Sequence, residues 1–417
     1  MLITPPLALY VHFPWCVQKC PYCDFNSHAL RGELPADQYI DALIADLDAQ
    51  ALAAPNRPLV SIFLGGGTPS LFPPASLARL FAAIRGAASP SIRRSELTLR
   101  GPIQARSNAG DSPLIAPGRR NPGFTRRAKL ARTGKLAVLG RIHSPADTRR
   151  AAAELHAAGL DNFNLDLMYG LPDQSVDDAE DDVRSALQLQ PAHLSHYQLT
   201  LEPGTVFAAR PPSLPTDETI ETMLERCQAR LGDAGFERYE VSAYARRDRA
   251  CRHNLNYWQF GDYLGIGAGA HGKLTDTERG VIRRTRQQRD PRRYLKSGIA
   301  GLTVEEVPVE QRPFEFMLNA LRCVGGFERD AFESRTGLDF KSIEPTLQAL
   351  RARGLLMAVS GAPETANWRA TERGFRFLNE VLLDFLPASG RTLESRGLQF
   401  AAPSADLLTA VGRIRRE

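Results

Sequence analysis

Three cysteines near the amino terminus have a spacing that suits an iron–sulfur cluster. Cys16, Cys20 and Cys23 stand in the pattern C-x3-C-x2-C, after a short apolar run at residues 7–13 that predicts a buried strand. Three thiolates on one tight loop can each bind a different iron of a four-iron, four-sulfur cube, which usually has four cysteine ligands. With three ligands, one iron keeps an open coordination position.

A small chelating ligand would fit this open position. S-adenosylmethionine carries an amino and a carboxylate group that can chelate the free iron, and an electron from the cluster then cleaves the sulfonium to give a carbon radical. Structural zinc is the alternative, with His12 or His28 as the fourth ligand. Paired disulfides do not suit an odd number of clustered cysteines.

Length and cysteine usage narrow the class of protein. The 417 residues allow a large core and predict two or three domains. The sequence predicts neither a signal peptide nor an apolar run of membrane-spanning length. Cys227, Cys251 and Cys323 are scattered, and we expect them to be buried apolar fillers. This pattern predicts a cytoplasmic protein with a metal site and no disulfide framework.

The net charge of +5 comes from one stretch of the chain. Residues 100–134 contain eight Lys or Arg against the single acidic Asp111, so this stretch carries +7 and the remainder −2. A nucleic-acid interface would rest on this stretch alone, and we therefore expect no nucleic-acid partner. The same stretch is rich in Pro and Gly and shows no helix or strand periodicity.

Strand and helix patterns alternate through most of the chain, which indicates a parallel α/β sheet or barrel with functional groups at the carboxyl ends of the strands. One strand ends in the glycine run Gly65–Ser70, which would let the backbone approach a ligand closely, although an ordinary tight turn also explains it. The predicted helices span 35–54, 75–87, 146–158, 176–189 and 216–234, and the predicted strands 59–64, 96–99, 162–168, 194–201 and 236–244.

The pattern becomes helical beyond about residue 289. Helices are predicted at 312–322, 328–336, 343–353 and 372–385, with a small β-wing at 355–371. Residues 388–417 have little periodicity and are expected to be mobile. The predicted division is a partial barrel at 1–210, a joining segment at 211–290, a helical, winged-helix-like domain at 291–387 and the tail at 388–417.

Five motifs occur in an order that resembles a known family. They are Cys16–Cys23, Gly65–Pro69, Leu139–His143, Asp166–Pro172 and His253–Trp258. Together they resemble the radical S-adenosylmethionine proteins related to oxygen-independent coproporphyrinogen III oxidase, over about residues 5–385. Two features favour the haem chaperone branch. Phe25 stands where the oxidase branch has a fourth cysteine, and residues 253–258 read HNxxYW, a signature of the chaperone branch.

The resemblance implies roles for residues around the three cysteines, which would be the cluster ligands. Tyr10 and Tyr22 would flank S-adenosylmethionine, and Gly67 and Thr68 would meet its amino-acid end. A member of this branch would carry one [4Fe–4S] cluster and S-adenosylmethionine, with haem as its cargo. Its partners would be an electron donor and haem-acceptor proteins.

Three further residues are implied deeper in the barrel. Arg141 and Asp166 would make polar contacts, with Asp166 near the ribose, although an ion pair inside the barrel is the structural alternative. His253 would be a haem-iron ligand, since its aromatic neighbours suit the face of a porphyrin; a polar residue in a loop is the alternative.

Two expected pieces of the family pattern are missing. After the strand Glu-Leu-Thr-Leu the family reads Glu-Ala-Asn-Pro-Gly, where this chain has residues 100–104, and a later Gly-Val-Gln-Ser-Phe is absent. Suitable synonymous codons allow shifted reading frames to restore related peptides within 102–130. Our hypothesis is that about 100–134 are translated out of frame and disordered, with the loss of a strand–helix–strand unit. The nucleotide sequence decides this.

The predicted fold is therefore a partial (β/α) barrel of radical S-adenosylmethionine type followed by a winged-helix-like domain. The predicted function is binding haem and passing it to acceptor proteins in the cytoplasm. The first alternative is an enzyme, an oxygen-independent coproporphyrinogen III oxidase that decarboxylates propionates through an adenosyl radical. The second is a radical enzyme that modifies tRNA or DNA, which the charge distribution disfavours.

Overall fold

The computed structural model describes residues 1–87, 96–100, 124–130, 136, 138–141, 144–359 and 367–387. Its main feature is one twelve-stranded sheet in the order β14-β13-β12-β11-β1-β4-β5-β6-β7-β8-β10-β9. The strands are β1 Leu7–Phe13, β4 Leu59–Gly66, β5 Glu96–Arg100, β6 Phe124–Leu130, β7 Asn164–Tyr169, β8 His193–Gln198, β9 Glu237–Glu240, β10 Ala243–Ala245, β11 Asp262–Ile266, β12 His271–Asp276, β13 Val281–Arg286 and β14 Thr303–Glu306.

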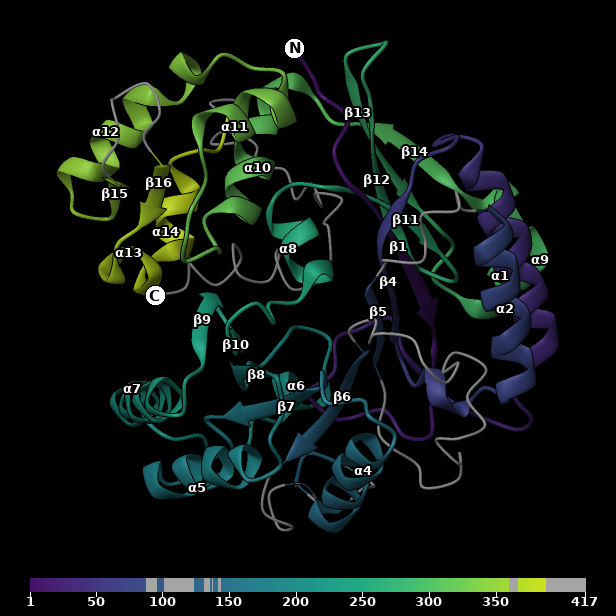
Figure 1. The fold of residues 1–417 in the computed structure, drawn as a ribbon, viewed down its shortest axis with the longest axis horizontal. Helices are drawn as coiled ribbons and strands as arrows, with labels where there is room; N and C mark the ends of the chain where they lie inside the picture. Colours follow the sequence, from purple (N-terminus) through teal and green to yellow (C-terminus); the bar gives the residue numbers. More distant parts are fainter. Residues whose placement is uncertain are drawn as a thin grey trace.

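The centre of this sheet is parallel. Seven neighbouring strands, from β11 through β1 to β8, run in one direction, and antiparallel strands flank them on both sides. The end strands β14 and β9 are not paired with each other, so the sheet curves without closing (Figure 1). The predicted partial barrel is confirmed.

One strand lies inside the stretch for which the sequence predicts no regular structure. β6 pairs in parallel with β5 (Leu97↔Phe124) and with β7 (Arg127↔Asn164). For 124–130 the expectation of disorder is wrong, because two flanking strands offer backbone hydrogen bonds to any extended chain between them, whatever its side chains. Residues 101–123 and 131–135, like the tail at 388–417, lie outside the described residues.

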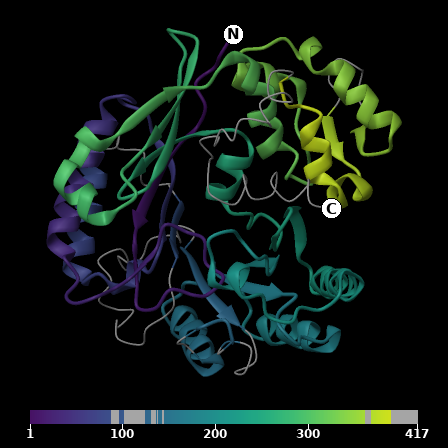
Figure 2. The same cartoon turned by 180° about the vertical axis from the view of Figure 1, so that it is seen from behind.

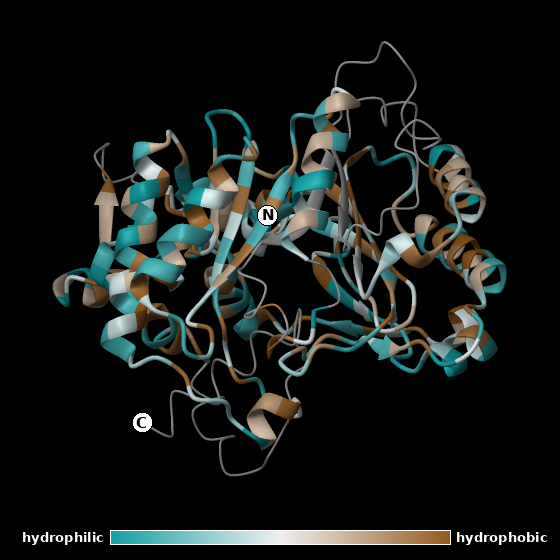
Figure 3. Cartoon of the chain, turned by 90° about the horizontal axis from the view of Figure 1, so that it is seen from below, coloured by the Kyte–Doolittle hydropathy of each residue, from teal (hydrophilic) through white to brown (hydrophobic). Residues whose placement is uncertain are grey.

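Helices cover the outer face of the sheet. Figures 1 and 2 show α1, α2 and α9 beside the part of the sheet that contains β11, β1 and β4, and α4, α5 and α7 beside β6, β7 and β8. Their turns alternate between hydrophobic and hydrophilic residues in Figure 3, as expected for amphipathic helices on a sheet. Their bounds are α1 Ala36–Ala51, α2 Pro74–Ala87, α4 Pro145–Ala157, α5 Val176–Leu187, α7 Asp217–Asp233 and α9 Pro291–Ser297.

Local sequence explains where these helices begin and which face they bury. α4 begins after Ser144 and α5 after Ser175, each with a capping box in which the serine and an aspartate three residues later satisfy free backbone N–H groups. In α1 the buried residues Tyr39, Ile40 and Leu43 recur at helical spacing against β1, which is itself almost wholly buried.

The carboxyl-terminal part has a hydrophobic core of its own. Phe316, Phe332, Leu347 and Trp368 are among the residues buried there. The strands β15 and β16 form the antiparallel wing that the sequence predicts. The elements are α10 Arg312–Ala320, α11 Arg329–Thr336, α12 Glu344–Ala352, β15 Leu356–Val359, β16 Asn367–Ala370, α13 Glu372–Arg376 and α14 Leu378–Leu383. A separate core explains why a helical periodicity replaces the alternating pattern in this part of the sequence.

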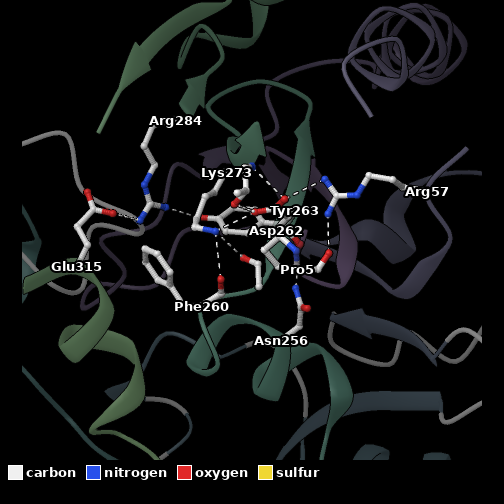
Figure 4. A network of polar contacts seen from close by, with 11 residues as sticks. Pro5, Arg57, Asn256, Phe260, Asp262, Tyr263, Lys273, Arg284 and Glu315 are labelled. Atoms are coloured by element: carbon white, nitrogen blue, oxygen red, sulfur yellow. Dashed lines mark hydrogen bonds and ion pairs between the residues drawn. The ribbon is translucent and has the colours of Figure 1, made fainter. Parts of the chain in front are cut away.

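Buried charges join this domain to the sheet (Figure 4). Lys273 Nζ lies 2.8 Å from Asp262 Oδ1, and Arg57 lies 2.9 Å from the other oxygen of the same carboxylate. Burial alone would raise the pKa of Asp262, but Lys273 and Arg57 hold it below its usual value. Arg284 on β13 pairs with Glu315 on α10. Because each buried charge has a partner, this network fixes the position of α10 relative to β11–β13.

None of the helices in the described ranges is both long enough and apolar enough to cross a membrane.

Candidate functional site

The three clustered cysteines lie on a loop at the carboxyl end of β1. The short strands Trp15–Cys16 and His28–Ala29 pair with each other and close the base of this loop. Inside it, the Cys23 N–H donates to the Cys20 carbonyl (3.1 Å), and all three thiols are half-buried. Burial raises the pKa of the Cys16 thiol, although hydrogen bonds from Thr68 and Ser27 oppose this shift. The loop with the three thiols therefore lies at the carboxyl edge of the sheet, as the sequence predicts.

The arrangement of these thiols can be compared with what each metal needs. Zinc requires four ligands that converge on one ion, whereas a four-iron cube takes each thiolate on a different iron. Within the described residues, no group of three His, Cys, Asp or Glu side chains surrounds a single point. His12 uses both ring nitrogens, with Tyr10 OH (2.7 Å) and the Asn26 carbonyl (2.8 Å). A zinc site would therefore need the three thiols to converge on one ion and His28 to supply the fourth ligand.

The glycine run packs against the start of the cysteine loop. The Gly67 N–H donates to the Phe13 carbonyl (2.6 Å) and the Thr68 N–H to the Trp15 carbonyl (2.7 Å). Gly66 has φ +91°, and a Cβ there would lie 2.5 Å from the ring of His12. The chain itself therefore requires glycine at 66, and the run brings the buried side chain of Thr68 beside Cys16.

Arg141 and Tyr22 meet on the other side of the loop. Arg141 donates to the Tyr22 hydroxyl, and its guanidinium lies 5.4 Å from the centre of that ring. Nearby, the Phe207 N–H donates to the Pro21 carbonyl (3.0 Å). The buried Nε of Arg141 has no hydrogen-bond partner among the described residues. An arginine with an unused donor beside the cysteine loop fits a site for a carboxylate ligand.

Asp166 lies deeper in the sheet than the cysteine loop. It is almost completely buried on β7, where its carboxylate accepts a hydrogen bond from Asn164 Nδ2 (2.9 Å). The amide oxygen of Asn164 lies 2.6 Å from His193 Nδ1 and accepts a hydrogen bond from Ser195 (3.1 Å). Asp166 therefore belongs to a polar cluster on β7 and β8.

The HNxxYW segment forms a short helix on the inner side of the sheet, α8 (Arg252–Trp258), between the strands and α10 (Figure 1). The loop that the sequence allowed as an alternative for His253 is therefore not found. The His253 ring is 5% exposed and lies 4.1 Å from the Phe63 ring and 4.6 Å from the Tyr257 ring, measured between centres. Phe63 in turn stacks on Tyr10 at 5.6 Å.

The remaining residues of this segment contact different parts of the molecule. Asn254 donates to the hydroxyl of Tyr239 on β9 (2.9 Å), and Asn256 donates to the Asp262 carbonyl (2.9 Å) at the start of β11. The guanidinium of Arg322, which follows α10, lies 4.4 Å from the ring of Trp258. The helix α8 thus joins the inner face of the sheet to the carboxyl-terminal domain.

Two family models match this chain. The Radical SAM superfamily matches residues 10–107, and the HemN C-terminal domain matches residues 307–377. The haem chaperone HemW of Escherichia coli K12 is 44% identical over 394 residues, which is 93% of this chain and 100% of that protein. HemW of Haemophilus influenzae Rd is 41% identical, with 92% and 98% covered, and HemW of Mycobacterium tuberculosis H37Rv is 33% identical, with 91% and 89% covered.

This chain belongs to the HemW family of radical SAM proteins. Among solved structures, the coproporphyrinogen III oxidase HemN of Escherichia coli, a radical SAM enzyme, superimposes with a TM-score of 0.74 at 20% identity, covering 92% of this chain and 90% of that chain. At this identity the likeness confirms the fold, with its open sheet and helical carboxyl-terminal domain, and does not by itself transfer an activity.

The site residues that the sequence predicts fall into two groups by position. The structure brings Tyr10, Tyr22, Thr68 and Arg141 around the cysteine loop, whereas Asp166 and His253 lie further inside. The predicted role of each residue stays a prediction. Cys227, Cys251 and Cys323 are buried, which confirms the prediction made for them.

Sequence reasoning missed one residue beside this site. His271 begins β12, directly after the glycine-rich turn at 265–270, and its ring is half-buried. Burial, together with the nearby positive charges of Arg286, Arg284 and Arg289, lowers the pKa of His271 to about 4. The glycine-rich turn before a histidine was visible in the sequence, but the arginines come from another strand and from the loop after it.

Proposed function

We propose that this HemW-family protein is a cytoplasmic haem chaperone that binds haem and transfers it to acceptor apoproteins. It would carry one [4Fe–4S] cluster and S-adenosylmethionine, and an electron donor would serve the cluster. The observation that carries the proposal is the 44% identity to the haem chaperone HemW over the full length of that protein. The cysteine loop, with three half-buried thiols beside Thr68 and Arg141, is consistent with both cofactors.

The residues of the site have separate tasks in this proposal. Cys16, Cys20 and Cys23 would hold three irons of the cluster, and the cluster, once bound, supplies an electron and an open iron site. Arg141 has an unused Nε donor with which it could fix a carboxylate. Tyr10 and Tyr22 would provide aromatic walls.

Three further residues complete the proposed site for S-adenosylmethionine. Gly67 and Thr68, which lie against the start of the cysteine loop, would meet the amino-acid end of the cofactor. Asp166 would contact the ribose from β7, where its carboxylate is buried deeper in the sheet. These assignments follow from the family resemblance and from the positions of the residues.

Anaerobic reconstitution with iron and sulfide tests the cofactor part. We expect about four iron atoms and as much acid-labile sulfide per chain, the content of one cube. A parallel sample with zinc in place of iron tests the alternative that uses His28. Uptake of stoichiometric zinc without iron or sulfide would overturn the cluster assignment.

Haem transfer needs a second assay. The reconstituted protein is titrated with haemin, followed by absorbance in the Soret region, and then mixed with an apo-haemoprotein whose spectrum differs. We expect saturable binding of haemin and movement of the haem to the acceptor faster than haemin alone would supply it. Saturable binding without any transfer would contradict the chaperone assignment.

The enzyme alternative remains open to a direct test. Phe25 occupies the position of the fourth cysteine of the oxidase branch, and it packs within the cysteine loop, where its carbonyl accepts from Ser27 N–H (2.6 Å). This difference favours the chaperone. Formation of protoporphyrinogen IX from coproporphyrinogen III under anaerobic conditions, with S-adenosylmethionine and a reductant, would instead establish the oxidase activity.

A further inference from the structure

His271 lies at the same edge of the sheet as the cysteine loop. Its carbonyl is placed against Gly265, which pairs with Tyr10 on β1, so His271 is two strands away from Tyr10. The turn before it and the loop after β13 are both attached to the cysteine loop, because Asn26 donates to the carbonyls of Ala268 and Arg289, both at 2.9 Å. A ligand on His271 would therefore lie beside the cluster site.

The rest of the described structure leaves the imidazole of His271 unused. It makes no hydrogen bond, ion pair or ring contact with any of the described residues, and the ring is only half-buried. Most other histidines are committed: His12 and His193 each use both nitrogens, His156 pairs with Asp161, His196 stacks on Tyr169, and His253 is covered by aromatic rings. The Nε2 atom of His28, on the cysteine loop, also lacks a partner among the described residues, but this atom is buried. An iron ligand needs an accessible, unprotonated nitrogen, and a neutral imidazole provides one.

Positive charge gathers around this imidazole. Arg286 faces His271 across the β12–β13 pair, and Arg289 follows on the next loop; both side chains are exposed. Among the described residues, Arg286 forms one long ion pair, with Glu305 at 3.9 Å, whereas Arg284 is already held by Glu315. The other titratable group close to the ring is His12, which is also buried and uncharged at neutral pH because burial lowers its pKa to about 4.

A neutral imidazole beside two exposed guanidinium groups matches the chemistry of haem. The iron accepts a neutral imidazole nitrogen as its axial ligand, and the two propionates are carboxylates, which arginine binds through paired hydrogen bonds. His253 lacks this combination, because its ring is wedged between Phe63 and Tyr257 and would have to leave the core to reach iron.

We propose that His271 is the axial ligand of the haem iron and that Arg286 and Arg289 bind the propionates, next to the cysteine loop. This inference rests on the proposed haem-binding function and names the part of the molecule that would perform it. It also assigns His253 to packing rather than to ligation.

The test is a haemin titration of the full-length, reconstituted protein and of single variants. We expect His271→Ala to weaken haemin binding by about tenfold or more, a loss of about 1.4 kcal/mol or more, and to shift the Soret band, with added imidazole restoring the wild-type spectrum. His156→Ala, on the outer side of the molecule, is the matched control and should bind as wild type does. Thermal unfolding of every variant shows that each is folded.

A second comparison addresses the arginines. We expect Arg286→Gln and Arg289→Gln each to weaken binding of haemin but not of its dimethyl ester, in which the propionate charges are removed. Equal weakening for both ligands would contradict the propionate assignment. Where wild type itself fails to bind haemin, the proposed function is wrong. Where wild type and His271→Ala bind haemin with the same affinity and spectrum, or where His253→Phe rather than His271→Ala loses the axial ligand, the His271 assignment alone is wrong.

Discussion

The cysteine loop and α8 both carry residues that the sequence predicts for the site, but the rest of the chain holds them differently. In the loop the thiols of Cys16, Cys20 and Cys23 remain half-buried. In α8 the side chains of His253 and Asn256 are 5% exposed and are committed to ring packing or to hydrogen bonds. Side chains that are not fully used by the protein can bind a ligand, whereas fully used ones determine how parts of the protein fit together.

The two regions meet through a short aromatic path. Tyr10, whose hydroxyl contacts His12 near the loop, stacks on Phe63, and Phe63 packs on His253 of α8. Tyr257 then contacts Tyr263 on β11, and the ring centres lie 4.6 Å apart. The packing of α8 therefore supports one wall of the proposed cofactor site, although α8 itself lies further inside.

The largest expected effect is on cluster content. Cys16→Ser should abolish the cluster, because one iron would lose its thiolate and the cube would keep only two cysteine ligands. Iron and acid-labile sulfide analysis after reconstitution measures this. Cys323→Ala removes a cysteine from the core instead and should keep normal iron content. A normal cluster in Cys16→Ser would show that Cys16 is not a cluster ligand.

On the α8 side, we expect a loss of stability instead of a loss of cofactor. His253→Ala should lower the free energy of unfolding by about 3 kcal/mol, because it removes a ring packed between two others. His253→Phe restores a ring of similar shape and should recover most of this loss. Urea unfolding measures both. A small effect of His253→Ala, within about 0.5 kcal/mol, would show that the ring is not needed for packing.

Acid should also lower the stability of the protein through His196, a buried histidine on β8. Burial lowers the pKa of His196 to about 3, and its ring stacks on Tyr169 with 4.5 Å between centres. Between pH 6.5 and about 3 the unfolded chain binds a proton at this position that the folded chain does not bind, so stability falls as the pH falls through this window.

At pH 4.5 the contribution amounts to about 2 to 3 kcal/mol. His196→Phe keeps the stacked ring and removes the titration, so its unfolding free energy should fall less than that of wild type between pH 7 and 4.5. Equal losses in the two proteins would contradict the assignment to His196.

The smallest expected effect concerns the contact between α8 and the carboxyl-terminal domain. The cation–π contact between Arg322 and Trp258 should contribute about 1 kcal/mol to stability, and Arg322→Gln should leave the iron content unchanged. Arg322 also pairs with Glu240 (3.2 Å). A double-mutant cycle with Trp258→Leu separates the two contributions, and a coupling energy near zero would show that the ring contact is not stabilising.

Much of the architecture was predictable because it rests on local patterns. Alternating strands and helices, serine caps at Ser144 and Ser175, and the shift to helical periodicity after residue 289 all act over a few residues. The strand at 124–130 was not predictable, since its side chains follow no strand pattern and only its neighbours β5 and β7 provide the pairing. The out-of-frame hypothesis for the surrounding stretch stays a prediction.

The candidate site also has a part that the sequence predicts and a part that it does not. The cysteine spacing alone indicates three ligands on one loop, because residues so close in sequence cannot be far apart in space. The sequence predicts His253 as a haem-iron ligand and gives no such indication for His271. A single sequence does not show which of the two rings other side chains cover. The ring of His253 is covered by Phe63, which lies on β4, more than 180 residues earlier in the chain. Arg286 lies beside His271 only because β12 pairs with β13.

The amino-acid sequence by itself thus determined the chemistry that is available, the order of the elements and the family pattern. Only the tertiary structure decided which histidine is buried and which is accessible. The physical reason is that burial and charge are properties of the space around a side chain. In this protein, residues from distant strands and loops fill that space.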